Sequence, residues 1–417
     1  LHIKASKLFQ PLTLPNGKTV PNRLCKAAME ENLSDEGQIP GDRLHRLYRS
    51  WVEGGVGLIL TGNVMVAPDA LTGPGGVVLQ ESTDIEPFKQ WAEAGKSEDG
   101  QFWMQINHPG RQVYAAMGET ALSPSDKTMD MGNFSNMFAQ PRAMTEEEIE
   151  VLIQRFTATS KQAELAGFTG VQVHAAHGYL ISQFLSPRHN QREDQWGGSL
   201  ENRMRFVREV YKAIRAEVGA DFPVGIKLNS ADFMKGGFSE ADSMQVIKQL
   251  SEDGIDLIEV SGGTYESPAM VGHRDKDDQP KASTVKREAY FLEYAESVRK
   301  HTDKPLVVTG GFRSSKGMAD ALNSGACDFV GLGRPFAVDP DLPNSAIQNP
   351  AYEINLRPLT TGVKAVDKMA MLDITWYEFQ LARMADKKAP NPKMSEWMAF
   401  AKTLAGAGMY AFKKRRA

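Results

Sequence analysis

The chain has 417 residues, of which 41% are hydrophobic and 24% charged, so it can bury the core of a barrel of about 250 to 400 residues. Its formal net charge of -4 argues against nucleic acid as the main partner. We expect neither a secretory leader nor a membrane-spanning segment, because no apolar run of the required kind occurs. Two cysteines cannot build a disulfide framework, so we expect reduced thiols and a cytoplasmic protein.

Short apolar runs recur along the chain, and most precede a helical pattern. The first feature, Leu12–Val20, carries an Asn16-Gly17 turn, which predicts a hairpin that covers the bottom of a barrel. Apolar runs without alternation are expected where both faces of a parallel strand are buried. Eight such strands are predicted: Leu24–Met29, Val56–Gly62, Phe102–His108, Gly170–Ala175, Pro223–Asn229, Leu257–Gly263, Pro305–Gly311 and Phe329–Arg334.

Amphipathic helices are predicted between these strands. They are Glu147–Ala166, Leu200–Val218, Ser239–Asp253, Tyr290–His301 and Ser315–Ser324. Thr145 and Glu148 have the spacing of a capping box before the first helix. Glycines 167, 219, 254 and 325 stand where helix C-caps belong. Eight β/α units favour a closed (β/α)₈ TIM barrel over an open sheet with helices on both faces.

The domain organisation follows from these elements. We expect the barrel, with a hairpin cap at about residues 8–21, to occupy residues 1–350. A helical extension over residues 351–417 is expected to pack on or near it. Residues 112–144 are expected to form a long excursion on the catalytic side of the barrel. The basic end Lys413–Arg416 is interpreted as the solvated end of a surface helix, with contact to an anionic membrane as the alternative.

Barrel enzymes place their active sites at the C-terminal ends of the strands, and polar or glycine residues end all eight strands here. Packing of an apolar strand does not explain that pattern. The strand ends are Met29-Glu30, Gly62, Gln105 with His108, His174 with His177 and Tyr179, Lys227, Ser261-Gly262-Gly263, Gly310-Gly311 and Gly333-Arg334.

The last two strand ends predict a phosphate site. Gly310, Gly311 and Gly333 allow backbone amides to approach an anion closely, and Arg334 offers a planar fork to phosphate oxygens. No strand is followed by G-x-G-x-x-G, so a Rossmann dinucleotide site is unsupported. The phosphate is therefore expected to belong to a ligand in the barrel mouth.

The fourth strand predicts catalytic residues. His174 and His177 can direct two N–H donors at one carbonyl or nitro oxygen and stabilise the charge that forms there when hydride arrives. The Tyr179 phenol can protonate the neighbouring carbon. A metal site would need a third ligand, which the sequence does not offer.

Lys227, which ends the fifth strand, has three roles open to it. It can form a Schiff base, hold an acid, or neutralise the anionic edge of a reduced flavin. A non-flavin barrel aldolase built around Lys227 is therefore an alternative function at this point.

Taken together, these motifs resemble the old yellow enzyme family of FMN-dependent oxidoreductases, over nearly all of residues 7 to 390. The segments that carry the resemblance are Pro21–Met29, Gln105–Arg111, His174–Leu185, Asn190–Arg203 and the two glycine-rich turns. The resemblance implies FMN as the cofactor, NADH or NADPH as the reductant and an activated alkene as the small-molecule substrate. It implies a ping-pong cycle and leaves a monomer or a homodimer open.

The resemblance also assigns site residues. Gln105 would bind the flavin pyrimidine, and Lys227 would face the N1/O2 edge, where many relatives have Arg. Ala28 and Met29 would lie beside the ring, and Gly62 is assigned to the cofactor site. Gly310, Gly311, Gly333 and Arg334 would hold the phosphate; His174 and His177 would bind the substrate oxygen, and Tyr179 would donate the proton.

Two residues depart from the family pattern. Glu30 stands where relatives usually carry Thr or Cys, near the flavin O4/N5 edge, and Asn32 stands where some place an active-site Tyr, so both enter the predicted site. An ionised Glu30 would oppose the charge of reduced flavin, whereas burial would keep it protonated. Our hypothesis from the sequence is that Glu30 lowers the flavin potential and slows its reduction.

Three functions remain to be weighed. An ene-reductase acting on α,β-unsaturated carbonyl or nitro compounds is favoured, because it uses His174, His177 and Tyr179 together. An NAD(P)H oxidase or quinone reductase on the same flavin is the alternative. A non-catalytic flavin-binding barrel leaves the three residues unexplained. Two cysteines supply too few ligands for the iron–sulfur cluster of the dienoyl-CoA reductases, and we expect neither that cluster nor their second domain.

Overall fold

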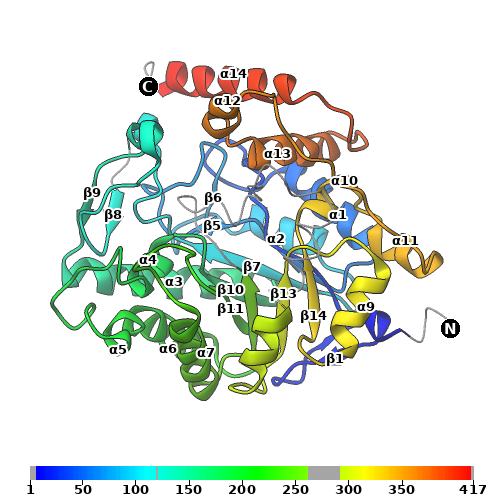
Figure 1. The fold of residues 1–417 in the computed structure, drawn as a ribbon, viewed down its shortest axis with the longest axis horizontal. Coiled ribbons are helices and arrows are strands. Elements are labelled where there is room, and N and C mark those ends of the chain that lie inside the picture. Colours follow the sequence, from blue (N-terminus) through cyan, green and yellow to red (C-terminus); the bar gives the residue numbers. More distant parts are fainter. Residues whose placement is uncertain (1–5, 119–120, 262–291, 415–417) are drawn as a thin grey trace.

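A computed structural model describes residues 6–118, 121–261 and 292–414, with side chains as far as residue 405. Eight parallel strands form a closed barrel, in which each strand pairs with the next and the last pairs with the first (Figure 1). In chain order they are β3 (Leu24–Lys26), β4 (Leu58–Leu60), β7 (Gln101–Asn107), β10 (Gly170–Ala175), β11 (Val224–Asn229), β12 (Leu257–Ser261), β13 (Leu306–Thr309) and β14 (Phe329–Leu332). The predicted TIM barrel is confirmed, and each strand overlaps a predicted run.

The barrel strands are buried on both faces, which explains their apolar runs. Residues that alternate along the strands, such as Leu58, Trp103 and Leu257, form a cluster in the barrel interior. The intervening residues join the larger core beneath the helices. Leu14 and Val20 of the N-terminal hairpin complete the interior cluster, so the hairpin closes one end of the barrel.

That hairpin consists of the antiparallel strands β1 (Leu12–Thr13) and β2 (Thr19–Val20), as predicted. Gly17, with a φ of +86°, supplies the left-handed residue that the turn requires. A short 3₁₀ helix, η2 (Lys7–Phe9), precedes it.

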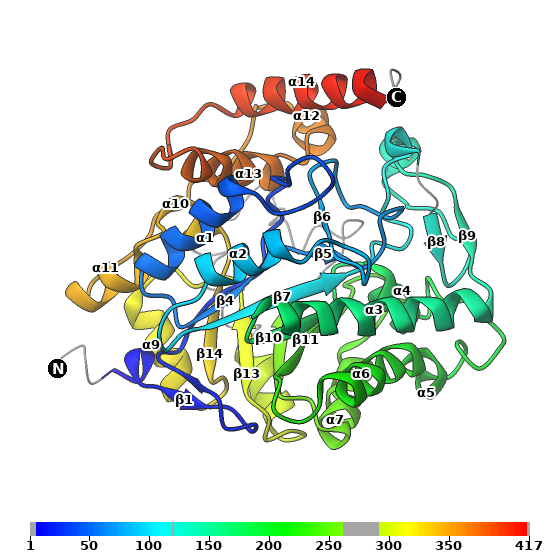
Figure 2. The same ribbon diagram turned by 180° about the vertical axis from the view of Figure 1, so that it is seen from behind.

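Helices surround the barrel (Figure 2). They are α1 (Asp42–Glu53), α2 (Glu86–Ala94), α3 (Glu146–Ala166), α4 (Leu180–Leu185), α5 (Leu200–Arg203), α6 (Arg205–Val218), α7 (Glu240–Asp253) and α9 (Ser315–Asn323). The capping box of Thr145 and Glu148 is formed at the start of α3. Of the predicted helix Tyr290–His301, residues 292–299 are described as helical and the beginning lies outside the described residues.

The predicted helix Leu200–Val218 is interrupted at Met204, which divides it into α5 and α6. The guanidinium of Arg203 donates to the carbonyls of Gly198 and Leu185. These bonds hold α5 against the preceding loop, so tertiary contacts override a continuous helical pattern.

Two excursions leave the C-terminal side of the barrel. The first follows β4 and contains β5 (Val64–Met65) and β6 (Val77–Val78), which extend the sheet beyond β7. The second runs from β7 to α3 and covers the predicted residues 112–144. It contains η3 (Ala115–Met117), β8 (Ala121–Ser123), η4 (Gly132–Met137) and β9 (Pro141–Ala143), and β8 pairs with β9.

After β14 the chain forms α10 (Arg334–Val338), α11 (Leu342–Gln348), α12 (Lys364–Met369), α13 (Leu372–Ala385) and α14 (Glu396–Lys414). Helix α13 packs against α1, α10 and α14. Figure 1 shows α12, α13 and α14 at the end of the molecule opposite the β1 hairpin. No helix in the described ranges is long and apolar enough to cross a membrane.

Candidate functional site

Two histidines and a tyrosine converge where β10 ends. His174 is the penultimate residue of the strand and faces inward, and His177 follows in a turn with a φ of +59°. The ring centroids of His174 and His177 are 5.2 Å apart, and those of His174 and Tyr179 are 4.8 Å apart. The structure therefore brings together the three residues predicted to act on the substrate.

Burial and nearby positive charge keep both imidazoles neutral. Burial is the larger cause that lowers the pKa of His174 and of His177 well below the usual range, and Lys227 adds to it in both. The Nδ1 atom of His174 accepts a hydrogen bond from the Ala176 amide at 3.2 Å, so its proton lies on Nε2. The Nε2 atom of His177 lies 2.9 Å from the Ser261 hydroxyl. His174 is thus prepared to donate from Nε2.

Polar side chains inside the barrel form a connected network below this trio. Gln105 donates to Gln172 at 2.8 Å, and Gln172 donates to Glu259 at 2.7 Å. Lys227 forms an ion pair with Glu259 at 3.1 Å, and the Thr309 hydroxyl donates to the same carboxylate at 2.7 Å. The network fixes Gln105 and Lys227, the two predicted contacts of the flavin ring, in one layer of the barrel.

The ends of β13 and β14 form a cradle suited to an anion. Gly310 and Gly311 have φ angles of +121° and +84°, a backbone path that favours glycine. Arg334 begins α10 and lies with its guanidinium carbon 5.9 Å from the centre of the Tyr377 ring. No carboxylate in the described ranges forms an ion pair with Arg334. This arrangement leaves a fork of donors for a phosphate.

The segment after β3 lies against the first excursion and α13. Ala28 and Met29 are half-buried, and Met29 lies 3.6 Å from the position that a β-carbon on Gly333 would take. Glu30 accepts a hydrogen bond from the Thr72 hydroxyl, and Asn32 donates to Glu378 at 2.7 Å. The two residues that depart from the family pattern therefore share one cluster.

Gly62, which the sequence assigns to the cofactor site, packs against Glu31 and Tyr48. Its amide donates to Glu31 at 3.0 Å and to the Tyr48 hydroxyl at 2.7 Å. A β-carbon on Gly62 would lie 2.0 Å from a Glu31 oxygen, so only glycine fits. Gly62 packs on a buried carboxylate, and a direct contact of this residue with the cofactor stays a prediction.

Several residues of the site were missed in the sequence. Gln172 and Glu259 stand two residues before the strand-end residues His174 and Ser261, so the two-residue alternation of a strand places them on the inward face. Glu378 has no comparable signal, because it lies on α13 and is 346 residues from Asn32 in the sequence. Gly262 and Gly263 lie outside the described residues.

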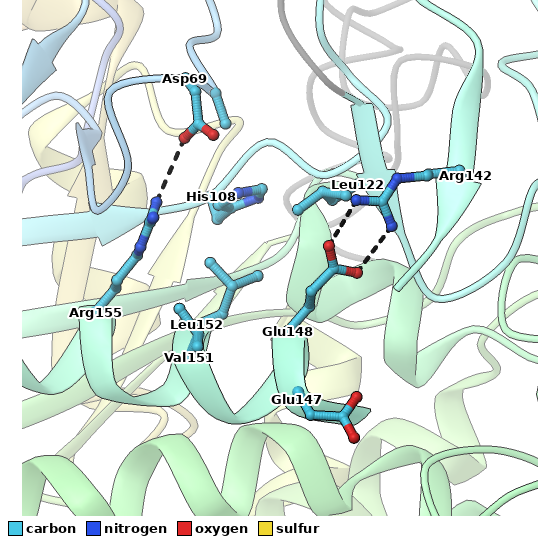
Figure 3. Close-up of a pocket in the computed structure, with 10 residues that line it drawn as sticks. Asp69, His108, Leu122, Arg142, Glu147, Glu148, Val151, Leu152 and Arg155 are labelled. Atoms are coloured by element: carbon cyan, nitrogen blue, oxygen red, sulfur yellow. Dashed lines mark hydrogen bonds and ion pairs between the residues drawn. The ribbon is translucent and has the colours of Figure 1, made fainter. Parts of the chain in front are cut away.

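A separate cavity of about 270 Å³ lies between α3, the β8–β9 sheet and the loop that carries Asp69 (Figure 3). Its rim holds the ion pairs Arg142–Glu148, at 2.6 Å, and Arg155–Asp69, at 3.4 Å. Burial lowers the pKa of His108, at its inner wall, to about 4. Apart from this strand-end histidine, the cavity is lined by none of the predicted site residues, so it is distinct from the barrel mouth.

Comparison with known proteins identifies the family. The model of the NADH:flavin oxidoreductase / NADH oxidase family matches residues 7–352. The chain is 38% identical over 368 residues to an NADH-dependent flavin oxidoreductase of Talaromyces variabilis, covering 84% of this chain and 87% of the relative. It is 37% identical over 360 residues to one of Neonectria sp., covering 82% of this chain but only 47% of that relative.

The fold resembles that of an old yellow enzyme homologue from Zymomonas mobilis, with a TM-score of 0.70 and 25% sequence identity. That match covers 83% of this chain and 94% of the other. The sequence matches, the closed barrel and the strand-end site agree with one another. The chain therefore belongs to the NADH:flavin oxidoreductase family, the family of the old yellow enzymes.

Proposed function

We propose that the protein binds FMN in the barrel mouth, accepts hydride from NADH and reduces the activated C=C bond of an α,β-unsaturated carbonyl or nitro compound. The observation that carries this proposal is the convergence of His174, His177 and Tyr179 at the end of β10. NADH is favoured over NADPH because the relatives from Talaromyces variabilis and Neonectria sp. are NADH-dependent.

The residues present fit FMN. The consecutive left-handed glycines Gly310 and Gly311, together with Gly333 and Arg334, suit a phosphate monoester. Gln105 can still accept and donate through its amide, which matches the pyrimidine edge of a flavin. Lys227 uses one of its three N–H donors on Glu259 and keeps the others for the N1/O2 edge. Ala28 and Met29 would lie beside the ring.

When bound there, FMN would supply the hydride for the β-carbon of the substrate. His174 Nε2 and His177 would hold the carbonyl or nitro oxygen, where negative charge develops as the hydride arrives. Because both imidazoles are neutral, they donate hydrogen bonds without protonating the oxygen. Tyr179 would then transfer its phenolic proton to the α-carbon, which completes the addition of two hydrogens across the double bond.

The alternative within the family is an NADH oxidase or quinone reductase, which the family description itself includes. Either reaction needs only flavin reduction and an electron acceptor. Neither requires a proton donor beside an oxygen-binding pair, so the trio favours the alkene. The ion pair of Lys227 with Glu259 disfavours a Schiff-base aldolase, because a Schiff base needs a free neutral amine.

Product analysis tests the proposal. The purified protein is expected to release FMN on denaturation and, with NADH under anaerobic conditions, to convert 2-cyclohexenone to cyclohexanone. Arg334→Ala is expected to weaken FMN binding by about tenfold or more, because a charge-assisted bond is worth roughly 1.5–3 kcal/mol. Release of FAD, or NADH consumption only when oxygen or a quinone is supplied, would contradict the proposal.

A further inference from the structure

A buried carboxyl group connects the segment after β3 to the segment after β4. Glu31, which is 7% exposed, accepts a hydrogen bond at Oε1 from the Tyr48 hydroxyl. The same oxygen accepts a hydrogen bond from the Gly62 amide at 3.0 Å. That amide also lies 2.7 Å from the Tyr48 hydroxyl, to which it donates. Glu31, Tyr48 and Gly62 therefore contact one another in all three pairs, and we call this arrangement the Glu31 clamp.

The Glu31 clamp also fixes the backbone of Met29. A β-carbon on Gly62 would lie 2.0 Å from Glu31 Oε2 and 2.4 Å from the Met29 carbonyl oxygen, so both groups pack directly on this glycine. The Met29 side chain extends to the other side, where its Cγ lies 3.6 Å from the position of a β-carbon on Gly333. The clamp thus reaches, through Met29, a residue of the predicted phosphate cradle.

The Tyr48 member of the clamp is held by the core beneath it. Its ring is fully buried and makes edge contacts with Trp51 and Trp91, at centroid distances of 5.0 and 5.2 Å. The Lys26 ammonium group lies 5.0 Å from the centre of the same ring and donates to the Leu60 carbonyl at 2.7 Å. A side chain packed on several sides has little freedom to move, so Tyr48 gives the clamp a rigid base.

We propose that Glu31 is a positioning residue of the flavin site, which fixes residues 28–30 in the place where they lie beside the cofactor ring. The inference rests on the proposed FMN binding. Residues 28–33 lie outside the strands and helices of the described structure, so side-chain contacts must hold this segment. Among these contacts, the clamp ties the segment to the barrel itself, because Gly62 follows β4 directly. A binding site needs such support to keep its geometry.

Titration of the FMN-free protein with FMN, followed by flavin fluorescence, tests the proposal. Glu31→Ala is expected to weaken FMN binding by about tenfold or more, because the hydrogen bonds that fix the segment are lost. Glu31→Gln keeps an oxygen that can accept from Gly62 and Tyr48, so it should retain most of the affinity. Tyr48→Phe, which removes one hydroxyl, should weaken binding less than Glu31→Ala. Wild-type affinity in both Glu31→Ala and Tyr48→Phe would overturn the proposal.

The spectrum of the bound flavin separates positioning from a general loss of stability. At saturating FMN, visible circular dichroism reports the groups beside the ring and should change in Glu31→Ala but follow wild type in Glu31→Gln. Leu14→Ala removes core packing at the other end of the barrel and should keep the wild-type spectrum and affinity. Glu36→Ala removes an exposed acid and is the matched control. Equal losses of affinity in Leu14→Ala and Glu31→Ala would mean that stability alone is affected, contrary to the proposal.

Amide hydrogen exchange examines the clamp without the cofactor. In FMN-free protein, the Gly62 amide and residues 28–33 are expected to exchange about tenfold faster or more in Glu31→Ala than in wild type, because a hydrogen bond that protects them is missing. Leu14→Ala should show no such local change. Unchanged exchange in Glu31→Ala would overturn the proposal. Faster local exchange together with no FMN binding by any of the proteins, wild type included, would instead contradict the proposed function.

Discussion

Tyr179 is the residue on which the assignment of alkene reduction depends most directly. Its ring lies 4.8 Å, centroid to centroid, from that of His174, which places a phenol beside the proposed oxygen site. Tyr179→Phe removes only the hydroxyl. We expect it to slow reoxidation of reduced enzyme by an enone by about 10²–10⁴-fold, the usual contribution of a general acid.

The control for this variant is the other half of the cycle. In the proposed cycle, reduction by NADH does not use the phenol, so its rate should change little in Tyr179→Phe. Rapid-mixing absorbance at the flavin band measures both rates separately. An equal loss in the two half-reactions would mean that Tyr179 acts through cofactor binding or folding instead.

Glu378 gives a prediction for stability against pH. Its pKa is raised from 4.5 to about 8 in the fold, so between these values the native protein binds more protons than the unfolded chain. Stability is then lost as pH rises through this window. Glu378→Gln should stabilise the protein at pH 8.5 by about 1–3 kcal/mol relative to wild type, and much less at pH 5.

Urea unfolding at the two pH values measures this difference. Glu150→Gln carries the same charge change at an exposed position and should alter stability equally little at both. If Glu378→Gln destabilises the fold most at high pH, the carboxyl group is ionised and stabilising, contrary to the account.

The residues that the sequence proposes for the site stand at strand ends, and the sequence did not point to neighbours that approach from other elements. Glycines and polar residues after apolar runs were sufficient to predict that His174, Tyr179 and Arg334 lie at strand ends, and their roles stay predictions. Glu378 escaped because α13 docks on α1 through contacts that no local pattern encodes. Lys26 was not predicted as a site residue, and its buried ammonium group lies over the rings of Tyr48 and Trp51.

Among the elements, the N-terminal hairpin is expected to contribute to stability and not to cofactor binding. Leu14 is 2% exposed and packs into the interior cluster with Trp103 and Leu257. Leu14→Ala should therefore destabilise the protein by about 2–5 kcal/mol, as large-to-small core substitutions do. Because the hairpin and the site lie at opposite ends of the barrel, the FMN content of folded protein should not change.

Denaturant unfolding and the flavin-to-protein absorbance ratio test this separation. Thr13→Ala, at an exposed position of the same hairpin, is the comparison variant and should lose far less stability. Loss of FMN from folded Leu14→Ala would show that the two ends are coupled.

The strands and caps were the elements most accessible from sequence. Continuous apolar runs identified all eight barrel strands, because burial on both faces leaves no alternation. The capping box identified the start of α3. The break at Met204 was not predictable, because it arises from the contacts of Arg203 with the loop before it.

At the scale of the whole molecule, the hairpin and the predicted site residues lie at opposite ends of the barrel. The hairpin seals the first end, and the C-terminal helices reach the second, where α13 places Tyr377 beside Arg334 and Glu378 beside Asn32. The C-terminal segment thus contributes side chains to the mouth. The sequence predicted its helices but not this contribution, which depends on the docking of α13.

The central claim is that hydride passes from NADH through the flavin to a carbon–carbon double bond. The most direct test reduces the purified protein with one equivalent of NADH in the absence of oxygen, then mixes it with 2-cyclohexenone or a nitroalkene and follows the flavin absorbance. The account predicts bleaching by NADH, rapid recovery on addition of the alkene and one saturated product per flavin. Bleached enzyme that recovers with oxygen or a quinone but with no enone or nitroalkene would contradict it.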